Sequence, residues 1–283
     1  MALALDLGTY VALLALVSLG LAIVLGLMHV INMAHPEFLT LGAYVAVLAQ
    51  AAGLPFVASL PLALAAAALI GCALETLLVR HTYGRAEDTI LATAGVALVM
   101  RQLFVLGFGA DAYSVQAPDT GMADVLGTAY PSYRLWLMGV AAAAITLTWL
   151  LFFRTRWGLA ARAVMTDRAT ARSLGIRGAR HDRATFSLGC GLAGLAGAML
   201  APLSSVEPML GNLHGAPAFL SVLVGGMASI VAPVLGSTVL GSAQTLGAAW
   251  VSAAWAPVIM LALALVCVRL FPGGLLRPRV RQA

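Results

Sequence analysis

Long apolar runs are the feature of this sequence that most restricts its fold. The first of them, Leu7–Leu27, is about twenty residues long, which is the length that a helix needs to cross the roughly 30 Å hydrocarbon core of a bilayer. Hydrophobic residues make up 61% of the chain and charged residues only 10%, whereas a soluble domain carries roughly 25% charged residues. The sequence therefore predicts an all-α polytopic membrane protein.

Turn residues and charges divide the chain into about eight transmembrane helices, some of them discontinuous, within a single transmembrane domain at residues 1–283. The segment from Ala216 to Trp250 is about thirty-five residues long and is broken by Gly225-Gly226, so we interpret it as two short or discontinuous segments. The other expected spans are Leu7–Leu27, 36–50, about 55–80, Asp88–Phe108, Tyr133–Phe153, Ala184–Ser204 and Pro257–Leu270 with its flanks.

Small residues recur at every fourth position of one of these spans. They are Gly189, Ala193, Gly197 and Ala201. Residues four apart lie on the same side of a helix, and small side chains let a second membrane helix approach closely. The sequence therefore predicts a tight helix contact along this face.

Arginine is concentrated between Arg154 and Arg183, a stretch that holds eight of the sixteen basic residues. A basic loop between apolar spans is expected on the cytoplasmic side, because Lys and Arg resist translocation. The basic C-terminal tail predicts the same side for that end. The connection 107–131 contains no basic residue, so we expect it, and the N-terminus, on the outer face. Its acidic residues are Asp111, Asp119 and Asp124.

A short helix is predicted inside the basic loop from the residues at its two ends. Thr166 can serve as the N-cap, because its hydroxyl can accept from the N–H groups of the first turn. Asp167 would then lie at the positive end of the helix dipole. Gly175 can take the positive φ that often ends a helix, and Ile176 can make the hydrophobic contact that follows. Such a helix can dock on a cytoplasmic partner; the alternative is a solvated loop that only sets topology.

Three separated stretches resemble the branched-chain amino acid ABC transporter permeases. The loop pattern is Arg162-Ala163-x-x-x-Asp167-x-x-x-Ala171-x-x-Leu174-Gly175-Ile176. The second stretch is Asn32-x-Ala34-His35-x-Glu37-Phe38, and the third is Gly225-Gly226-Met227-x-Ser229-Ile230. Their order and spacing are similar to those of the family, so the resemblance covers nearly the whole chain.

The resemblance implies the permease subunit of an ATP-binding-cassette importer. Such a subunit moves branched-chain or related small amino acids across the bacterial inner membrane by ATP-driven alternating access. The implied partners are a second, homologous permease subunit that completes a heterodimer, two cytoplasmic ATPase subunits, a periplasmic substrate-binding protein and the membrane lipid.

The resemblance also implies roles for particular residues. The loop helix would be the coupling helix, in which Arg168 and Arg172 share one face. Residues expected to couple to the ATPase are Arg162, Asp167, Arg168, Arg172, Leu174 and Gly175. Residues of the possible translocation path are Asn32, His35, Glu37, Gly225 and Gly226.

Each path residue also has a purely structural interpretation. His35 and Glu37 can simply cap a helix at the interface, and Asn32 can bond exposed backbone instead of solute. The Gly225-Gly226 pair can serve only close helix packing. The sequence leaves these alternatives open.

Charged residues are rare within the expected spans. Arg101 is expected to snorkel toward the membrane surface, and Glu75 is expected to reach the headgroups. Because the deep parts of the spans hold almost no carboxylates, an ion-driven secondary transporter is a less favoured alternative.

Departures from the family pattern leave the solute open. Pro36 stands where the family usually has glycine, and Ala228 and Ala232 replace expected glycines. A permease for urea, short amides or another small polar solute is therefore the alternative function.

The composition excludes several other classes. The chain has no lysine, so it has no phosphate-binding loop, and any ATP would be bound by a partner. The three cysteines lack CxxC spacing, so neither a metal site nor a disulfide framework is expected, and we expect no cofactor in this chain. Clustered His, Asp or Ser residues that would indicate an enzyme do not occur, and the arginines form no nucleic-acid patch interleaved with aromatic residues.

Overall fold

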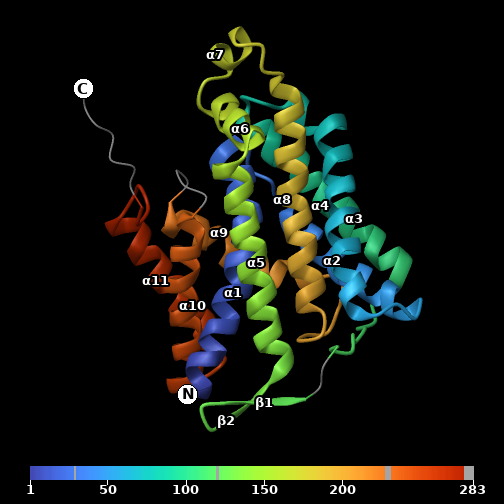
Figure 1. The fold of residues 1–283 in the computed structure, drawn as a ribbon, viewed down its shortest axis with the longest axis vertical. Helices are drawn as coiled ribbons and strands as arrows, with labels where there is room; N and C mark the ends of the chain where they lie inside the picture. Colours follow the sequence, from blue (N-terminus) through green and yellow to red (C-terminus); the bar gives the residue numbers. More distant parts are fainter. Residues whose placement is uncertain (29, 119–120, 227–230, 277–283) are drawn as a thin grey trace.

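The computed structural model describes residues 1–28, 30–118, 121–226 and 231–276. These residues form a bundle of helices with a small β-hairpin at the end of the molecule where the N-terminus lies (Figure 1). Three predicted features lie outside the described residues, namely the basic tail at 277–283, Asp119 of the outer connection, and positions 227–230 of the glycine-containing motif.

The described residues contain α-helices, one π-helix, one 3-10 helix and two strands. In chain order they are α1 (Ala2–Ala22), the π-helix η1 (Ile23–Leu27), α2 (His35–Ala51), α3 (Phe56–Leu77), the 3-10 helix η2 (Val79–His81), α4 (Ala86–Phe108), β1 (Met122–Val125), β2 (Thr128–Pro131), α5 (Ser132–Arg154), α6 (Arg156–Thr166), α7 (Arg168–Ser173), α8 (Gly178–Leu200), α9 (Leu210–Gly225), α10 (Ala232–Trp250) and α11 (Ala256–Leu270).

Five helical segments of the described chain are long and apolar enough to cross a membrane. They are Ala2–Leu27, Phe56–His81, Ala86–Phe108, Ser132–Arg154 and Gly178–Leu200. Helices α2, α9 and α11 are shorter, and α10 is less apolar. The structure is therefore an all-α polytopic membrane protein, as predicted.

The segment expected to be broken is two separate helices. Helices α9 and α10 run antiparallel, because the end of α9 at Gly225 lies against the start of α10 at Ala232. With both counted, nine segments of the described chain run along the bundle, close to the eight expected. Five of these segments, α1 to α5, come before α7 in the chain. Because five is an odd number of passes, the N-terminus and α7 lie at opposite ends of the molecule, as the charge distribution predicts (Figure 1).

Helices α1 and α8 form the centre of the bundle. In the most apolar 18-residue stretch of each helix, 72% of the residues are buried in α1 and 78% in α8. The corresponding buried share in α3, α4 and α5 is only 22–28%. The peripheral helices expose large apolar side chains, among them Leu69, Leu91 and Leu147. A water-soluble protein rarely exposes so much apolar surface, whereas lipid or a partner subunit can cover it.

The predicted small-residue face of α8 is confirmed. A Cβ added to Gly197 would lie 1.8 Å from the carbonyl oxygen of Leu39 in α2, and one added to Gly189 would lie 2.7 Å from the carbonyl oxygen of Gly20 in α1. No side chain fits at such distances. Glycine therefore allows the backbones of α2 and α1 to touch α8 directly.

The hairpin on the outer connection is not foreseen by the sequence analysis. Strands β1 and β2 pair antiparallel, with Val125 opposite Thr128. Leu126 and Gly127 between them both have positive φ, at 50° and 78°, which is the two-residue turn that suits the twist of a hairpin. The hairpin is anchored to the bundle because the Tyr130 hydroxyl donates to Asp6 Oδ1 at 2.9 Å.

Candidate functional site

The connection between α1 and α2 brings polar groups into the middle of the bundle. Helix α2 begins at His35, whose Nε2 lies 3.3 Å from the carbonyl oxygen of Val17 in α1. Val17 is ten residues, or about 15 Å, before the end of the π-helix at Leu27. The second pass through the membrane is therefore discontinuous, because residues 30–34 are not helical and α2 starts inside the protein. Pro36 lies in the first turn of α2, as expected.

Two side chains of this break are buried and only partly paired. Asn32 Oδ1 accepts from the Ala34 backbone N–H at 3.0 Å, so the structural interpretation of this oxygen is correct. The Asn32 Nδ2 group is buried and has no hydrogen-bond partner in the described chain. His35 Nε2 donates to a carbonyl, so Nδ1 of the neutral ring is an acceptor, and it too is buried without a described partner. Such groups are costly unless they bind something.

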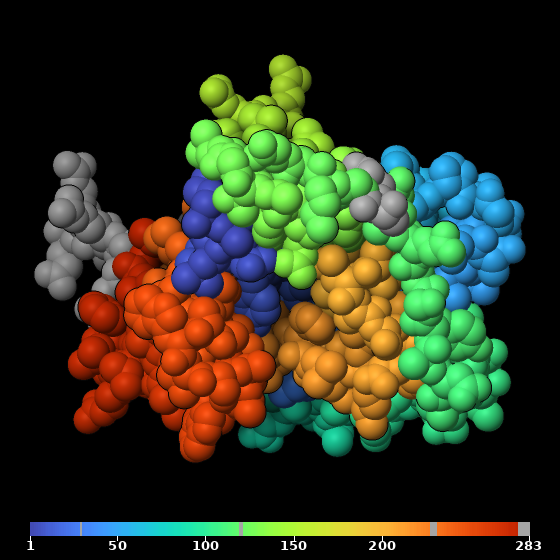
Figure 2. All heavy atoms as spheres, turned by 90° about the horizontal axis from the view of Figure 1, so that it is seen from below, coloured from blue at the N-terminus to red at the C-terminus, as the bar shows by residue number. Residues whose placement is uncertain are grey.

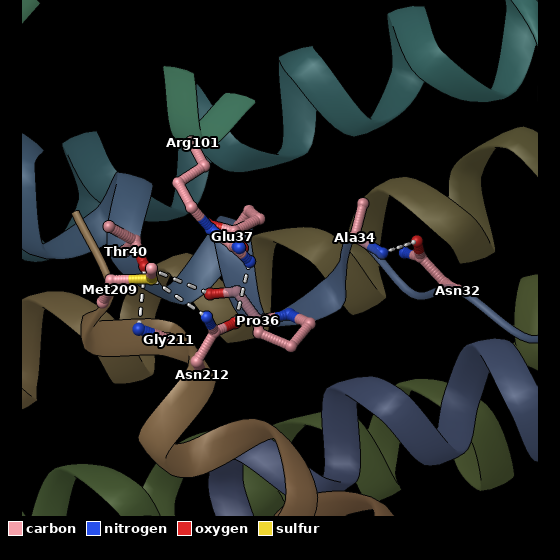
Figure 3. A network of polar contacts seen from close by, with 9 residues as sticks. All are labelled: Asn32, Ala34, Pro36, Glu37, Thr40, Arg101, Met209, Gly211 and Asn212. Atoms are coloured by element: carbon pink, nitrogen blue, oxygen red, sulfur yellow. Dashed lines mark hydrogen bonds and ion pairs between the residues drawn. The ribbon is translucent and has the colours of Figure 1, made fainter. Parts of the chain in front are cut away.

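Glu37 belongs to an ion pair that joins three helices (Figure 3). Its side chain lies in the first turn of α2, and the residue is only 1% exposed. Arg101 reaches from α4, and its Nη2 lies 2.6 Å from Glu37 Oε1. The same Nη2 donates to Asn212 Oδ1 of α9 at 3.0 Å.

The expectation that Arg101 snorkels to the membrane surface is wrong. Its guanidinium turns inward because a buried carboxylate needs a compensating charge, and Arg101 supplies it. Glu37 Oε2 and Arg101 Nε keep no hydrogen-bond partner in the described chain, so the pair is not saturated. An intramembrane ion pair of this kind is by default a candidate functional site.

The start of α9 is held against the start of α2. The Gly211 N–H donates to Thr40 Oγ1 at 2.9 Å. A Cβ on Gly211 would lie 2.0 Å from the carbonyl oxygen of Pro36, so only glycine permits this contact. The arrangement places Asn212 beside the ion pair (Figure 3).

A pocket of about 350 Å³ lies beside this cluster, between the break and α9. Asn32, His35 and Asn212 provide its hydrogen-bonding side chains, and Leu21 and Phe219 provide apolar walls. Its volume is sufficient for a small organic solute. We call it the inner pocket. Chemically it offers an amide donor and an imidazole acceptor to a bound molecule.

Gly225 and Gly226 do not join this cluster. They end α9, about 20 Å along the helix from Asn212. A Cβ on Gly225 would lie 2.0 Å from the carbonyl oxygen of Ala232, and Gly226, at φ 107°, packs near Gly273. Their position is that of a close helix contact, which was one of the two interpretations left open.

The basic loop forms two helices, of which the sequence analysis predicted only the second, α7. Its expected N-cap is wrong by one residue: Asp167, not Thr166, accepts from the N–H groups of Ala169 and Thr170, at 2.9 and 3.0 Å. The Thr166 hydroxyl instead donates to the carbonyl of Arg162 within α6. Hydrogen bonds from the Thr170 hydroxyl and N–H lower the pKa of Asp167, which keeps the cap charged.

The predicted C-terminus of α7 is confirmed. Gly175 has φ 80°, its N–H donates to Arg172 O, and the Ile176 N–H donates to Ala171 O. These two bonds form the glycine-containing end that the sequence indicates. Arg172 and Leu174 are exposed there.

Arg168 is not free to point outward with Arg172. Both its terminal nitrogens bind the carboxylate of Asp182 in α8, at 2.9 and 3.0 Å, and its guanidinium lies 5.3 Å from the centre of the Tyr83 ring. The ion pair ties α7 to α8 and to the turn between α3 and α4. The predicted coupling helix is thus attached to the membrane bundle through this arginine.

Glu75 takes part in the same network, so the expectation that it reaches the headgroups is wrong. It is buried and accepts from the Tyr83 hydroxyl at 2.9 Å and from Arg183 Nε at 3.4 Å. Burial, and secondarily the Glu75 charge, raises the pKa of Tyr83, which therefore remains a neutral donor.

Arg162 lies on α6, where its guanidinium stacks 4.6 Å from the centre of the Phe153 ring of α5. Helix α6 is anchored by Thr155, whose side chain accepts from the Gly158 N–H at 3.0 Å. A groove of about 380 Å³ runs between α6 and α7, with Leu159 and Leu174 exposed along it. We call it the coupling groove.

Sequence reasoning missed several residues of both regions. Arg101, Asn212 and Asp182 are the most important of them. A charge inside an apolar span was the available signal for Arg101, because such a charge usually pairs within the protein. The described residues contain no group of three or more His, Cys, Asp or Glu side chains that could hold a metal ion.

Comparison with known proteins identifies similar sequences over almost the whole chain. The sequence pattern of the family described as "Branched-chain amino acid transport system / permease component" matches residues 3–268. The high-affinity branched-chain amino acid transport system permease protein LivH of Salmonella typhimurium is 27% identical over 289 residues, covering 95% of this chain and 92% of LivH. The corresponding protein BraD of Pseudomonas aeruginosa is 28% identical, covering 95% and 93%.

The fold is similar to that of a solved structure, PsaBC from Streptococcus pneumoniae in complex with Fab. It aligns with a TM-score of 0.50 over 93% of this chain and 89% of that chain, at 14% sequence identity. At so low an identity the likeness concerns the fold alone.

Proposed function

The chain belongs to the family of permease components of branched-chain amino acid transport systems, and from this premise we propose that it is the membrane-spanning subunit of an ATP-binding-cassette importer. It moves branched-chain or related small amino acids across a bacterial inner membrane by ATP-driven alternating access. The observation that carries the proposal is the family match over residues 3–268, supported by relatives whose names state the same transport role.

The importer needs further subunits. This chain contains no lysine and therefore no phosphate-binding loop, so two cytoplasmic ATPase subunits bind and hydrolyse the ATP. A second, homologous permease completes a heterodimer, and a periplasmic binding protein delivers solute to the outer face, where the connection 107–131 lies near its docking surface. The subunit itself is a transport component and not an enzyme.

The geometry of α7 supports a role in coupling. A helix of six residues is too short to be stable by itself. Here its N-terminus is capped by Asp167 and its C-terminus by Gly175, and Arg168 ties it to α8. Movement of an ATPase bound in the coupling groove is therefore passed to the central helix α8.

The cluster at the start of α2 supports a role in the path. Glu37 and Arg101 connect α2 to α4 and, through Asn212, to α9. The inner pocket beside them has buried hydrogen-bonding groups without partners in the described chain. Rearrangement of these three helices can expose or close the pocket during alternating access.

The test combines Arg172→Glu with Gly175→Val in the reconstituted complex. Valine at a φ of 80° is strained, so the end of α7 unravels, while charge reversal weakens docking on an acidic partner surface. We expect solute-stimulated ATP hydrolysis to be lost while the permease still inserts. Arg180→Glu is the matched control, because Arg180 is an exposed arginine of the same loop outside α7 and the coupling groove.

The outcome of this test is read from two measurements. These are ATPase activity with and without solute, and co-purification of the ATPase subunits. If both survive in the double variant, the loop only sets topology and the coupling role is wrong. Uptake of labelled L-leucine and of labelled urea by the unmodified complex then decides the solute class, since uptake of urea alone would support the alternative function.

A further inference from the structure

A second cavity lies inside the bundle on the side opposite the coupling groove. It has a volume of about 570 Å³ and is lined by α1, α5, α8, α9 and α10. Figure 2 views the molecule from the outer end and shows a hollow between the start of α1 (blue), the hairpin (green), the chain after α8 (orange) and the end of α10 (red-orange). We call it the outer cavity.

The outer cavity reaches deep into the protein. Asp6 lines its outer part and Val17 its inner part, and these residues of α1 are about 16 Å apart along the helix axis. The Val17 carbonyl accepts the hydrogen bond from His35, which lines the inner pocket. Val17 and His35, which are in direct contact, therefore form a wall between the two cavities. On α9, His214 faces the outer cavity while Asn212 and Gly215 face the inner pocket.

The mouth of the outer cavity carries one charge of each sign. Asp6 and Arg134 form an ion pair, and each side chain is about 40% exposed (41% and 40%), so both meet water. Asp6 Oδ1 is already shared by Arg134 and the Tyr130 hydroxyl. Asp6 Oδ2 takes part in neither of these bonds, and Arg134, whose guanidinium also lies 5.8 Å from the centre of the Tyr130 ring, keeps part of its guanidinium exposed to a solute. An ammonium and a carboxylate on one small molecule fit this pair.

Inside the mouth the lining becomes neutral and largely apolar. Leu13, Leu14 and Leu200 form apolar walls. The Gln244 Oε1 atom is buried and has no hydrogen-bond partner in the described chain. The Nδ1 of His214 donates to the Leu210 carbonyl, which leaves Nε2 of the neutral ring as an acceptor. A cavity with unpaired acceptors and apolar walls suits a polar molecule that also carries an apolar group.

We propose that the outer cavity is a binding site for a small zwitterion with an apolar side chain, where solute waits before it crosses the wall at Val17 and His35. The mouth holds the ammonium at Asp6 and the carboxylate at Arg134, and the apolar side chain lies against the leucines. This inference rests on the proposed import function. It places the first site of the path inside this one subunit.

The test uses a single new cysteine in the cavity, Thr245→Cys, in the complete complex reconstituted without the binding protein. A charged, membrane-impermeant thiol reagent should modify it from the outer side, and L-leucine should protect it. With a dissociation constant of about 1 mM, about 50 mM L-leucine slows modification about fifty-fold. L-leucinamide, which lacks the carboxylate, and 4-methylpentanoate, which lacks the ammonium, should protect at least ten-fold less well, because each loses one charge contact.

Ala129→Cys is the control, because Ala129 is exposed on the hairpin outside the cavity and should react equally with and without L-leucine. Ala248→Cys, on the same wall of α10 as Thr245, repeats the measurement if Thr245→Cys lowers expression. The unmodified chain measures how much of the labelling comes from its three native cysteines.

Three results would overturn the proposal. They are protection by L-leucine of less than about five-fold, equal protection by the two analogues, and modification only by a membrane-permeant maleimide, which would mean that the cavity opens to lipid. Uptake of L-leucine by the same complex, with the binding protein added, separates the two levels of inference. Uptake without protection refutes only the outer site, whereas no uptake refutes the import function on which it rests.

Discussion

Replacing Arg101 with methionine tests whether the Glu37–Arg101 pair holds the centre of the protein together. The Glu37 side chain is 2% exposed and that of Arg101 is 26% exposed, so the carboxylate has almost no water available when its partner is removed. Breaking a buried pair by removing one member costs about 3–5 kcal/mol. We expect Arg101→Met to reach that range.

The converse change should be milder. In Glu37→Gln the amide oxygen still accepts from Arg101, and the guanidinium keeps Asn212 and some water, so the expected cost is about 1–3 kcal/mol. The double variant Glu37→Gln with Arg101→Met removes both charges and should be no less stable than Arg101→Met alone. The resulting coupling energy between the two residues should be about 2–3 kcal/mol.

Unfolding of the purified permease in detergent, followed by circular dichroism, measures these differences. Arg85→Met is the matched control, because Arg85 pairs with Asp88 on the exposed cytoplasmic turn and should contribute under about 1 kcal/mol. If Glu37 only caps α2, its charge is worth about 0.3–1 kcal/mol and Arg101 does not matter. A cost of Arg101→Met below about 1 kcal/mol, or strictly additive effects, would therefore refute the buried-pair reasoning.

Three further outcomes are expected. Gly197→Ala should destabilise the protein by about 1–3 kcal/mol, because its Cβ meets the backbone of α2. Gly139→Ala, whose Cβ meets nothing within 4 Å, should be neutral or slightly stabilising. Equal melting temperatures of the two variants would contradict the close contact. Arg168→Ala should destabilise the protein by about 3 kcal/mol, because Asp182 stays buried without its cation. Arg172→Ala should instead reduce the coupling of ATP hydrolysis to solute while leaving stability unchanged. The reverse pattern would show that α7 is oriented differently. Asp124→Cys should react with an impermeant maleimide in intact cells, and reaction only after lysis would reverse the topology.

The contacts of α8 indicate how the two ends of the molecule communicate. Arg168 of α7 binds Asp182 in the first turns of α8. Farther along, its glycine face touches α1 and α2, which carry Val17 and His35 in the wall between the two cavities. A shift of α8 is therefore transmitted directly to α1 and α2, because their backbones touch α8 with no side chain between them that could absorb the movement.

Much of this protein can be inferred from the sequence because the relevant signals are local. Apolar length determines where a membrane helix can lie, and arginine content determines which side its loop occupies. The predicted end of α7 at Gly175 and the small-residue face of α8 were correct for the same reason: a positive φ and a four-residue spacing depend on a few neighbouring positions. The error at the other end of α7, Thr166 instead of Asp167, is a shift of one residue between two adjacent capping side chains.

The candidate site depends on contacts that no local pattern encodes. Arg101 meets Glu37 across 64 positions, and Arg183 meets Glu75 across 108. Arg101, expected at the membrane surface, turns inward because Glu37 is buried and too costly to leave unpaired, and Glu75, also expected there, is buried with Arg183 as its partner. The depth at which α2 starts, the shared wall at Val17 and the outer cavity follow from how helices distant in the sequence pack against one another. Sequence therefore determined the class, most of the spans and the basic loop with its short helix, while tertiary packing decided which polar groups face one another inside the bundle.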